Sequence, residues 1–225
     1  MIMKNVFVIG DIVTLKSHPL LEDEFIKGDG KLVPPLMLVT EIFIEDKKKR
    51  THSEVLGKKI ADKIKYVCIF FDDNRTEFKK VTIYESMLSE FPERKKDDKK
   101  QKIPTSEKYL KDYVFGNNVN FKTNLLELSK QRKSKKTDER KNLKAKGKVD
   151  PISISEVTTT LNVVNFSSPK FVLCGIKKNE ITNDFYPNGE ERKVVSKILY
   201  KVKWFNSNQM KFSEEFLPAE CFIDI

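Results

Sequence analysis

The chain of 225 residues is 39% hydrophobic and 34% charged, which is enough apolar material for one large domain or two small ones. No stretch approaches the ~18 apolar residues of a membrane helix. The apolar run that begins at Met1 is too short for a signal peptide, so we expect a cytoplasmic protein without a membrane span. Cys68, Cys174 and Cys221 are far apart and set in apolar runs, as expected of buried thiols in a reducing compartment. No Cys or His spacing predicts a metal site, and we expect no cofactor.

The formal net charge of +10 is concentrated in the middle of the chain. Residues 1–92 contain 15 basic and 15 acidic residues, and residues 149–225 contain 9 and 10. Residues 93–148 contain 19 basic and 8 acidic residues, a net charge of +11. This excess predicts binding to DNA, RNA or an acidic protein surface. The alternative is a solvated, Lys-rich linker that keeps the protein soluble.

The first segment, residues 1–92, is expected to be a small β domain. Alternating apolar residues predict strands in FVIGDIVTLK (7–16), LMLVTEIFI (36–44), KYVCIFFD (65–72) and TEFKKVTI (76–83). Between the last two, Asp72-Asp73-Asn74 predicts a tight turn and not an acid pair with chemistry. Ile83, Met87 and Phe91 recur at helical spacing, which predicts a short helix at the end of this domain.

Residues 93–148 are interpreted as a basic, largely helical connector. Thr105 or Ser106 can cap a helix over TSEKYLKDYVF (105–115), and Phe121, Leu125 and Leu128 predict a second helix that continues into basic residues. The candidate nucleic-acid-binding residues of the connector are Lys130, Arg132, Lys133, Lys135, Lys136, Arg140, Lys141 and Lys144. Because most of them are lysines, we expect contacts to phosphates without sequence readout.

Residues 149–225 are expected to repeat the first domain. At an offset of 134, Tyr66 meets Tyr200, Phe70 meets Trp204 and Phe78 meets Phe212, without a gap. Upstream, PPLMLVTEI (34–42) falls on SPKFVLCGI (168–176), and GDIVTLKS (10–17) is aligned with ISEVTTTLNV (154–163). An ungapped correspondence of this kind predicts a duplication. The expected fold is mainly β: two tandem SH3-like small β-barrels joined by the helical connector.

Few side chains are candidates for a site outside the connector. Phe70 and Trp204 are candidates for outward-facing aromatic contacts with a base or a peptide, with packing between the domains as the alternative. His18 and His52 lie in polar segments and form no pattern with a nucleophile. We therefore expect no enzymatic activity.

The first domain resembles the YodC-like family of small, uncharacterised bacterial proteins. The motifs that carry the resemblance are GDIVTLKS (10–17), MLV (37–39) and CIFF (68–71), with Phe78 and Leu88 in the closing positions. Phe70 stands where the family has Trp, whereas the second domain keeps that residue as Trp204. His18-Pro19 replaces a Gly-Gly pair of the family. The resemblance implies an SH3-like barrel and no known activity.

The sequence therefore predicts a non-enzymatic tandem SH3-like protein that associates with nucleic acid through its basic connector. The alternative is a protein–protein interaction adaptor or an accessory subunit of a larger complex.

Overall fold

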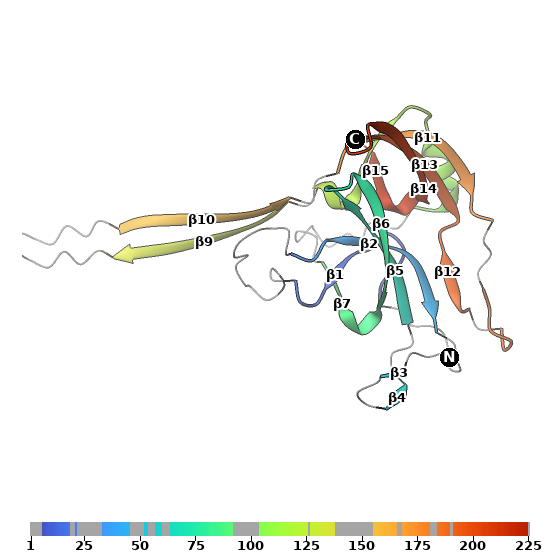
Figure 1. Ribbon diagram of the computed structural model, residues 1–225, viewed down its shortest axis with the longest axis horizontal. Helices are drawn as coiled ribbons and strands as arrows, with labels where there is room; N and C mark the ends of the chain where they lie inside the picture. Colours follow the sequence, from blue (N-terminus) through green and yellow to red (C-terminus); the bar gives the residue numbers. More distant parts are fainter. Residues whose placement is uncertain are drawn as a thin grey trace, which may run out of the picture. The chain divides into compact units, whose positions relative to one another are not determined.

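The computed structural model describes residues 6–18, 21, 33–45, 52–53, 57–59, 64–91, 104–125, 127–137, 155–165, 168–180, 184–189 and 191–224. The prediction of a mainly β protein is confirmed: the described residues form two large antiparallel sheets, two separate two-stranded sheets and one α-helix (Figure 1). The chain divides into two compact units, residues 1–126 with 166–225, and residues 127–165. No helix of the described ranges has the length and apolarity needed to cross a membrane.

The first sheet has the strand order β6-β5-β2-β1-β7, and we call these strands repeat 1. Their bounds are β1 Ile12–Leu15, β2 Met37–Ile44, β5 Ile64–Asp72, β6 Glu77–Tyr84 and β7 Leu88–Glu90. The insertion between β2 and β5 carries a small hairpin, β3 (His52–Ser53) with β4 (Lys58–Lys59). The helix predicted after Tyr84 is wrong, because only one 3-10 turn forms (η3, Glu85–Met87) before β7 pairs with β1.

The second sheet has the equivalent order β14-β13-β11-β8-β15, and we call these strands repeat 2. Their bounds are β8 Asn118–Phe121, β11 Phe171–Lys178, β13 Ile198–Asn206, β14 Lys211–Pro218 and β15 Phe222–Asp224. A 3-10 turn, η5 (Ala219–Cys221), again precedes the last strand. Among the described residues, strand pairing closes neither sheet into a ring.

The strand register of the two sheets recurs at the offset of 134. Leu38 pairs with Ile69 in repeat 1, and Val172 pairs with Lys203 in repeat 2. The β-bulge that follows Val39 recurs after Leu173. Every pair between β5 and β6 also has its counterpart between β13 and β14. The two repeats thus share one backbone plan down to an irregular position.

The start of repeat 2 differs from the prediction. Its first strand is β8, which pairs with β11 as β1 pairs with β2. Just before β8, Gly116 has a φ of 83° and donates its N–H to Leu173 O, as Gly10 with a φ of 87° donates to Val39 O. GDIVTLKS (10–17) therefore corresponds to GNNVNFKT (116–123), at an offset of 106, and not to residues 154–163.

The helical connector is only partly present. The first predicted helix is confirmed as α1 (Ser106–Asp112), with Thr105 accepting a hydrogen bond from the Lys108 N–H as its N-cap. The second predicted helix is wrong. Residues 122–125 form a 3-10 turn (η4, Lys122–Leu125), and β9 (Glu127–Thr137) follows, pairing along its whole length with β10 (Ser155–Asn165). Long-range pairing with a β-branched strand overrides the helical propensity of the basic residues.

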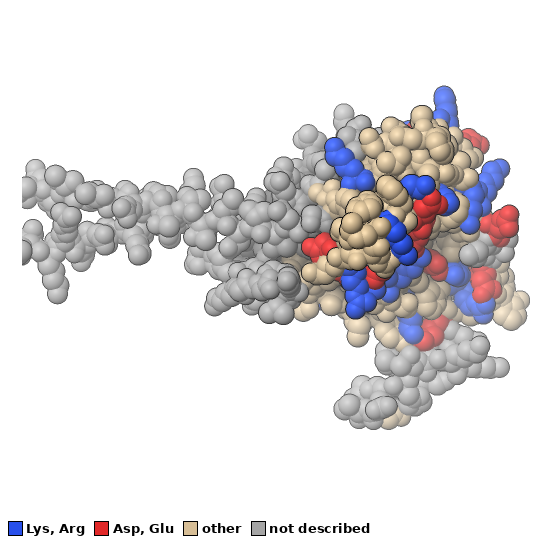
Figure 2. Space-filling view, turned by 45° about the horizontal axis from the view of Figure 1, so that its top comes forward, with Lys and Arg blue, Asp and Glu red and all other residues tan. Residues whose placement is uncertain are grey.

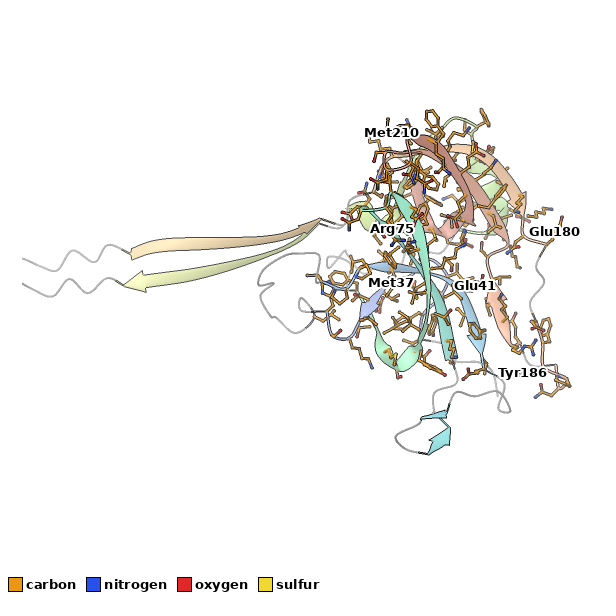
Figure 3. All side chains as sticks on the ribbon, viewed as in Figure 1. Met37, Glu41, Arg75, Glu180, Tyr186 and Met210 are labelled. Carbon is orange, nitrogen blue, oxygen red and sulfur yellow. The ribbon has the colours of Figure 1, made fainter. Side chains whose placement is uncertain are left out.

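Each of the two repeats contributes a segment that packs on the other. The insertion between β11 and β13 of repeat 2 contributes β12 (Lys193–Val195), which adds to β2 of repeat 1. In the same arm, the Tyr186 hydroxyl donates to Ile44 O at 2.7 Å, and Lys193 pairs with Glu41 at 2.7 Å (Figure 3). In the other direction, the β5–β6 hairpin of repeat 1 packs on aromatic rings of repeat 2. The two sheets therefore form one body held from both sides.

Candidate functional site

The basic candidate residues fall on a two-stranded ribbon, β9–β10. β9 carries five of them, namely Lys130, Arg132, Lys133, Lys135 and Lys136. The other three, Arg140, Lys141 and Lys144, lie outside the described residues. The ribbon has eleven paired positions, from Glu127 opposite Asn165 to Thr137 opposite Ser155. The structure therefore brings the first five candidates together on one strand, instead of on the predicted helix.

The register of the ribbon assigns these positions to its two faces. Successive residues of a strand belong to opposite faces. Lys130, Arg132 and Lys136 therefore share one face, opposite Asn162, Thr160 and Glu156 of β10. The positions of Lys133 and Lys135 belong to the other face, opposite Thr159 and Val157. Both faces of the ribbon thus contain basic positions, and only one of these five is paired with an acidic position.

In the chain, the ribbon occupies the loop between the first and second strands of repeat 2. The corresponding loop of repeat 1 joins Leu15 to Met37, whereas in repeat 2 the loop joins Phe121 to Phe171. The loop of repeat 2 is longer by 28 residues, because the offset changes from 106 to 134 across it. The basic ribbon is therefore an insertion into an otherwise repeated plan.

Outside the ribbon, basic residues are interleaved with acidic ones. Lys201 and Lys203 both pair with Glu214, and together they lower the pKa of Glu214 to about 2 by hydrogen bonding. Lys80 of repeat 1 pairs with Glu215 of repeat 2 at 3.0 Å. Figure 2 shows the two signs of charge mixed over the described surface. In that view the described surface has no extended patch of one sign of charge, whereas β9 carries five basic residues and one acidic residue.

The prediction of an outward-facing Trp204 is wrong. Trp204 is only 5% exposed, and its ring lies 5.4 Å from Phe78 and 5.7 Å from Phe171. Phe70 is half-buried and packs against the core cluster of repeat 1. The alternative, packing between the domains, holds for Trp204. In repeat 2 the neighbouring Phe205 takes the outward position instead.

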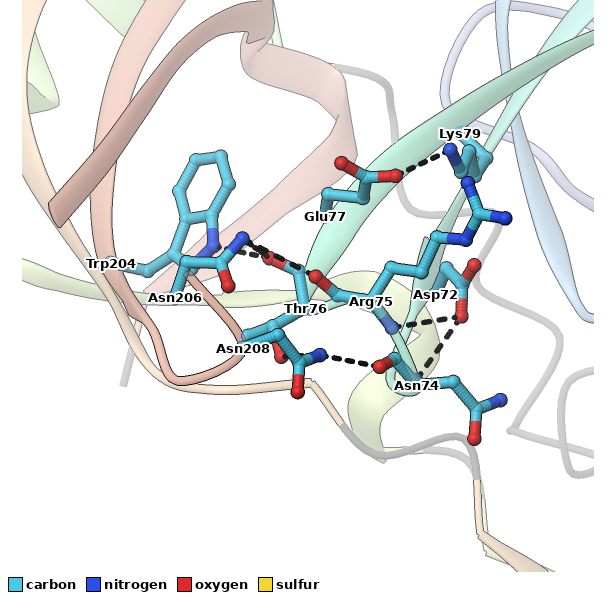
Figure 4. Close-up of polar contacts among 9 residues, drawn as sticks. All are labelled: Asp72, Asn74, Arg75, Thr76, Glu77, Lys79, Trp204, Asn206 and Asn208. Carbon is cyan, nitrogen blue, oxygen red and sulfur yellow. Dashed lines mark hydrogen bonds and ion pairs between the residues drawn. The ribbon is translucent and has the colours of Figure 1, made fainter. Parts of the chain in front are cut away.

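The two hairpin turns meet in a polar network around Trp204 (Figure 4). The indole Nε1–H donates to Thr76 O at 2.8 Å, and the Asn206 amide donates to Arg75 O at 3.3 Å and to Thr76 O at 3.1 Å. The Asn208 amide donates to Asn74 O. These bonds satisfy the carbonyls of a turn that repeat 1 inserts against repeat 2.

Asp72 is used within its own turn. Its carboxylate accepts from the N–H of Asn74 at 3.1 Å and of Arg75 at 3.3 Å. Such bonds fix an Asx turn. The prediction that Asp72 and Asp73 form a turn is confirmed.

A half-buried carboxylate, Glu220, lies where the start of repeat 1 meets the end of repeat 2. The Glu220 carboxylate accepts from Ser196 Oγ at 2.7 Å, and burial raises the pKa of Glu220. Nearby, Lys122 Nζ donates to Gly10 O at 3.1 Å. A Cβ on Gly10 would lie 2.8 Å from the Glu220 Cβ, so this close approach requires glycine. The contact joins the loop before β1 of repeat 1 to η5 of repeat 2, next to the buried Cys221 thiol.

His18 and Cys68 are buried side chains. The His18 ring is buried 5.8 Å from Phe91, and burial lowers the pKa of His18. Burial raises the pKa of the Cys68 thiol to about 12, so this thiol stays protonated and unreactive. Within the described ranges, no three His, Cys, Asp or Glu side chains are grouped so that they could hold a metal ion.

Comparison with protein-family models, with curated proteins and with solved structures finds no match.

Proposed function

We propose that this protein is a non-enzymatic, nucleic-acid-associated module whose β9–β10 ribbon contacts phosphates without reading sequence. The observation that carries the proposal is the charge of the sequence segment that begins in β9 and continues beyond it. From Lys130 to Lys148 there are ten basic residues against Asp138 and Glu139, a net charge of +8 in nineteen residues. Displacement of condensed counterions by such a segment favours binding to a polyanion.

The form of the ribbon supports the same function. A two-stranded antiparallel ribbon is one of the elements that the major groove of B-DNA admits. Eleven residues at about 3.4 Å each give a ribbon of about 37 Å, close to one turn of duplex. In the proposed arrangement, the ribbon neutralises phosphates through Lys130, Arg132, Lys133, Lys135 and Lys136.

The proposal includes an SH3-like identity for each repeat. Five short strands, with the fifth returning beside the first, bring each sheet towards the closure expected of a small barrel. The left-handed Gly10 supports the YodC-like resemblance, because it opens the motif that carries it. The resemblance and the cytoplasmic location remain predictions.

The test is a titration of fluorescein-labelled DNA duplex and single-stranded RNA with the full chain, followed by fluorescence anisotropy. The ribbon variant is Lys130→Gln/Arg132→Gln/Lys136→Gln. The matched control changes three exposed lysines elsewhere, Lys16→Gln/Lys178→Gln/Lys197→Gln, with the same loss of three charges. We expect the ribbon variant to bind at least ~10-fold more weakly than the control at low salt. Absence of binding by the wild type at low salt, or equal losses in both variants, would contradict the proposal.

The alternative function, a protein–protein adaptor, is favoured by a different observation. Repeat 2 exposes Phe205 and Phe212, which are 45% and 70% accessible. A pull-down with the ribbon variant tests this alternative: an adaptor that does not depend on the ribbon charges should still recover its protein partner, and loss of the partner would count against it.

A further inference from the structure

The same aromatic pair is built twice in this protein, and only one copy is packed. In repeat 1, Phe71 and Phe78 make an edge-to-face contact at 5.1 Å, and both rings pack against Phe171 of repeat 2. In repeat 2, Phe205 and Phe212 make the equivalent contact at 5.5 Å. The two turns also share a left-handed residue, Thr76 with a φ of 56° and Met210 with a φ of 50°. The second hairpin therefore presents the same shape to solvent.

The exposed pair belongs to an open sheet face, which we call the outer face of repeat 2. Register places Val172, Lys203 and Glu214 in one row of this face, beside the row of Phe205 and Phe212. Val172 is 38% exposed, whereas its counterpart Leu38 in repeat 1 is fully buried. Met210, 76% exposed, stands at the end of the hairpin (Figure 3). Repeat 1 thus buries the face that repeat 2 leaves open.

The charges of the outer face favour a protein over a nucleic acid as its occupant. Glu214 lies between the lysines and pairs with both Lys201 and Lys203. A face with both signs of charge in one row can complement a copy of itself.

The arrangement of the repeats also restricts how a second copy could bind. A head-to-tail contact would insert Phe205 and Phe212 into repeat 1 of the next molecule, where Met37 and Leu88 correspond to Phe171 and Phe222. Met37 and Leu88 are each only 2% exposed, so that floor is already covered. Trp204 and Asn206, whose side chains donate to the inserted turn, are replaced there by Phe70 and Asp72, whose side chains have no N–H to donate. The remaining closed solution is a two-fold contact.

We propose that the outer face of repeat 2 is the interface of a homodimer, in which Phe205, Phe212 and Met210 of one chain pack on the same residues of a second copy. Sheets commonly pack face to face in this way. With ~200 Å² for a fully exposed side chain of this size, the pair with Met210 and Val172 offers about 400 Å² per chain. An interface of about 800 Å² in total lies at the weak end of specific interfaces, so the dimer dissociates on dilution.

Sedimentation velocity of the full, nuclease-treated chain tests the proposal, at loading concentrations from ~1 to ~300 µM. The variant is Phe205→Ser/Phe212→Ser, and the matched control is Phe115→Ser, which changes a phenylalanine that is 74% exposed elsewhere. We expect the wild type and the control to dimerise alike, and the double variant to dissociate at least ~10-fold more readily. Because the contact buries aromatic rings, ~1 M salt should leave the dimer intact.

Three results would overturn the proposal: a monomeric wild type over the whole range, an unchanged dimer in the double variant, or a dimer that ~1 M salt abolishes. If the double variant does not fold, as judged by Trp204 fluorescence, the single variant Phe212→Lys serves, since Phe212 is 70% exposed. The result is independent of the ribbon, because dimerisation is measured without nucleic acid. Loss of nucleic-acid binding by the double variant, with a wild type that stays monomeric, would assign the face to base stacking and refute the homodimer.

Discussion

The repeated hairpins allow one substitution to be made twice, in opposite environments. The ring centroid of Phe78 lies close to those of four other rings: Phe71 at 5.1 Å, Phe121 at 5.2 Å, Phe171 at 5.2 Å and Trp204 at 5.4 Å. Phe212 occupies the same position in repeat 2, is 70% exposed, and contacts one ring. If packing between the repeats stabilises the fold, Phe78→Ala must cost far more than Phe212→Ala.

The magnitude follows from the burial of each ring. Full burial makes a Phe→Ala change cost about 3–5 kcal/mol, and the half-buried Phe78 should cost about 2–4 kcal/mol of unfolding free energy. Phe212→Ala should cost less than about 1 kcal/mol in the monomer, because its ring is mostly in water. We therefore expect a difference of at least about 1 kcal/mol between the two variants.

Urea unfolding measures the unfolding free energies of both variants, at a protein concentration below that at which the chain would dimerise. Trp204 is the only tryptophan and touches Phe78, so its fluorescence reports the contact between the repeats, while circular dichroism reports the sheets. Equal losses of free energy in the two variants would refute the reasoning. A Trp204 signal that Phe78→Ala leaves unchanged would also contradict the packing.

Three further predictions concern the contacts between the repeats. Gly10→Ala should destabilise the fold more than Gly116→Ala by at least ~1 kcal/mol in urea unfolding, because both have a positive φ but only Gly10 approaches Glu220; equal costs would contradict the close approach. Trp204→Phe should cost about 1–2 kcal/mol, measured by circular dichroism, through loss of the bond to Thr76 O; no loss would mean that this bond does not stabilise the fold. Burial raises the pKa of Glu220 above its unfolded value, so ionised Glu220 destabilises the fold at neutral pH, and this penalty disappears as the pH falls through the raised pKa towards the unfolded pKa. The unfolding free energy of the wild type relative to Glu220→Gln should therefore rise from pH 7 to pH 4.5. A difference that is independent of pH would contradict the assignment.

The sequence was informative where apolar positions repeat without gaps. The offset of 134 carries through β11, β13, β14 and β15, because each strand keeps its pairing partners. It failed at β8, where Asn118 and Asn120 replace Ile12 and Thr14 and the offset from β1 is 106 instead of 134. The Gly116-Asn117 pair was the available signal, because a left-handed glycine opens both first strands.

The residues of β9 predict a helix, although they form a strand, for a physical reason. Lys, Arg, Gln and Leu in β9 all have good helix propensity, and their partners lie beyond a long loop. The β-branched residues of β10, 157–160 and 163–164, favour a strand. The sequence predicts this strand as the first of the second domain, whereas in the structure it pairs with β9. Pairing between distant segments cannot be read from either segment alone.

On β13 of repeat 2 the exposed aromatic residue is Phe205, one position after the predicted Trp204. Trp204 and Phe205 are adjacent and belong to opposite faces of β13, so composition does not decide which ring is buried. The decision comes from the insertion of Phe71 and Phe78 of repeat 1 beside Trp204. A contact between two domains therefore selected the buried ring.

The salt dependence of DNA binding tests the central claim most directly. If the ribbon neutralises phosphates, the logarithm of the binding constant falls linearly with the logarithm of the salt concentration, and Lys130→Gln/Arg132→Gln/Lys136→Gln makes that slope shallower by about 2–3. The Lys16→Gln/Lys178→Gln/Lys197→Gln control should keep the wild-type slope. A slope that is the same in the wild type and the ribbon variant would contradict the proposal that the β9–β10 ribbon is where this protein meets nucleic acid.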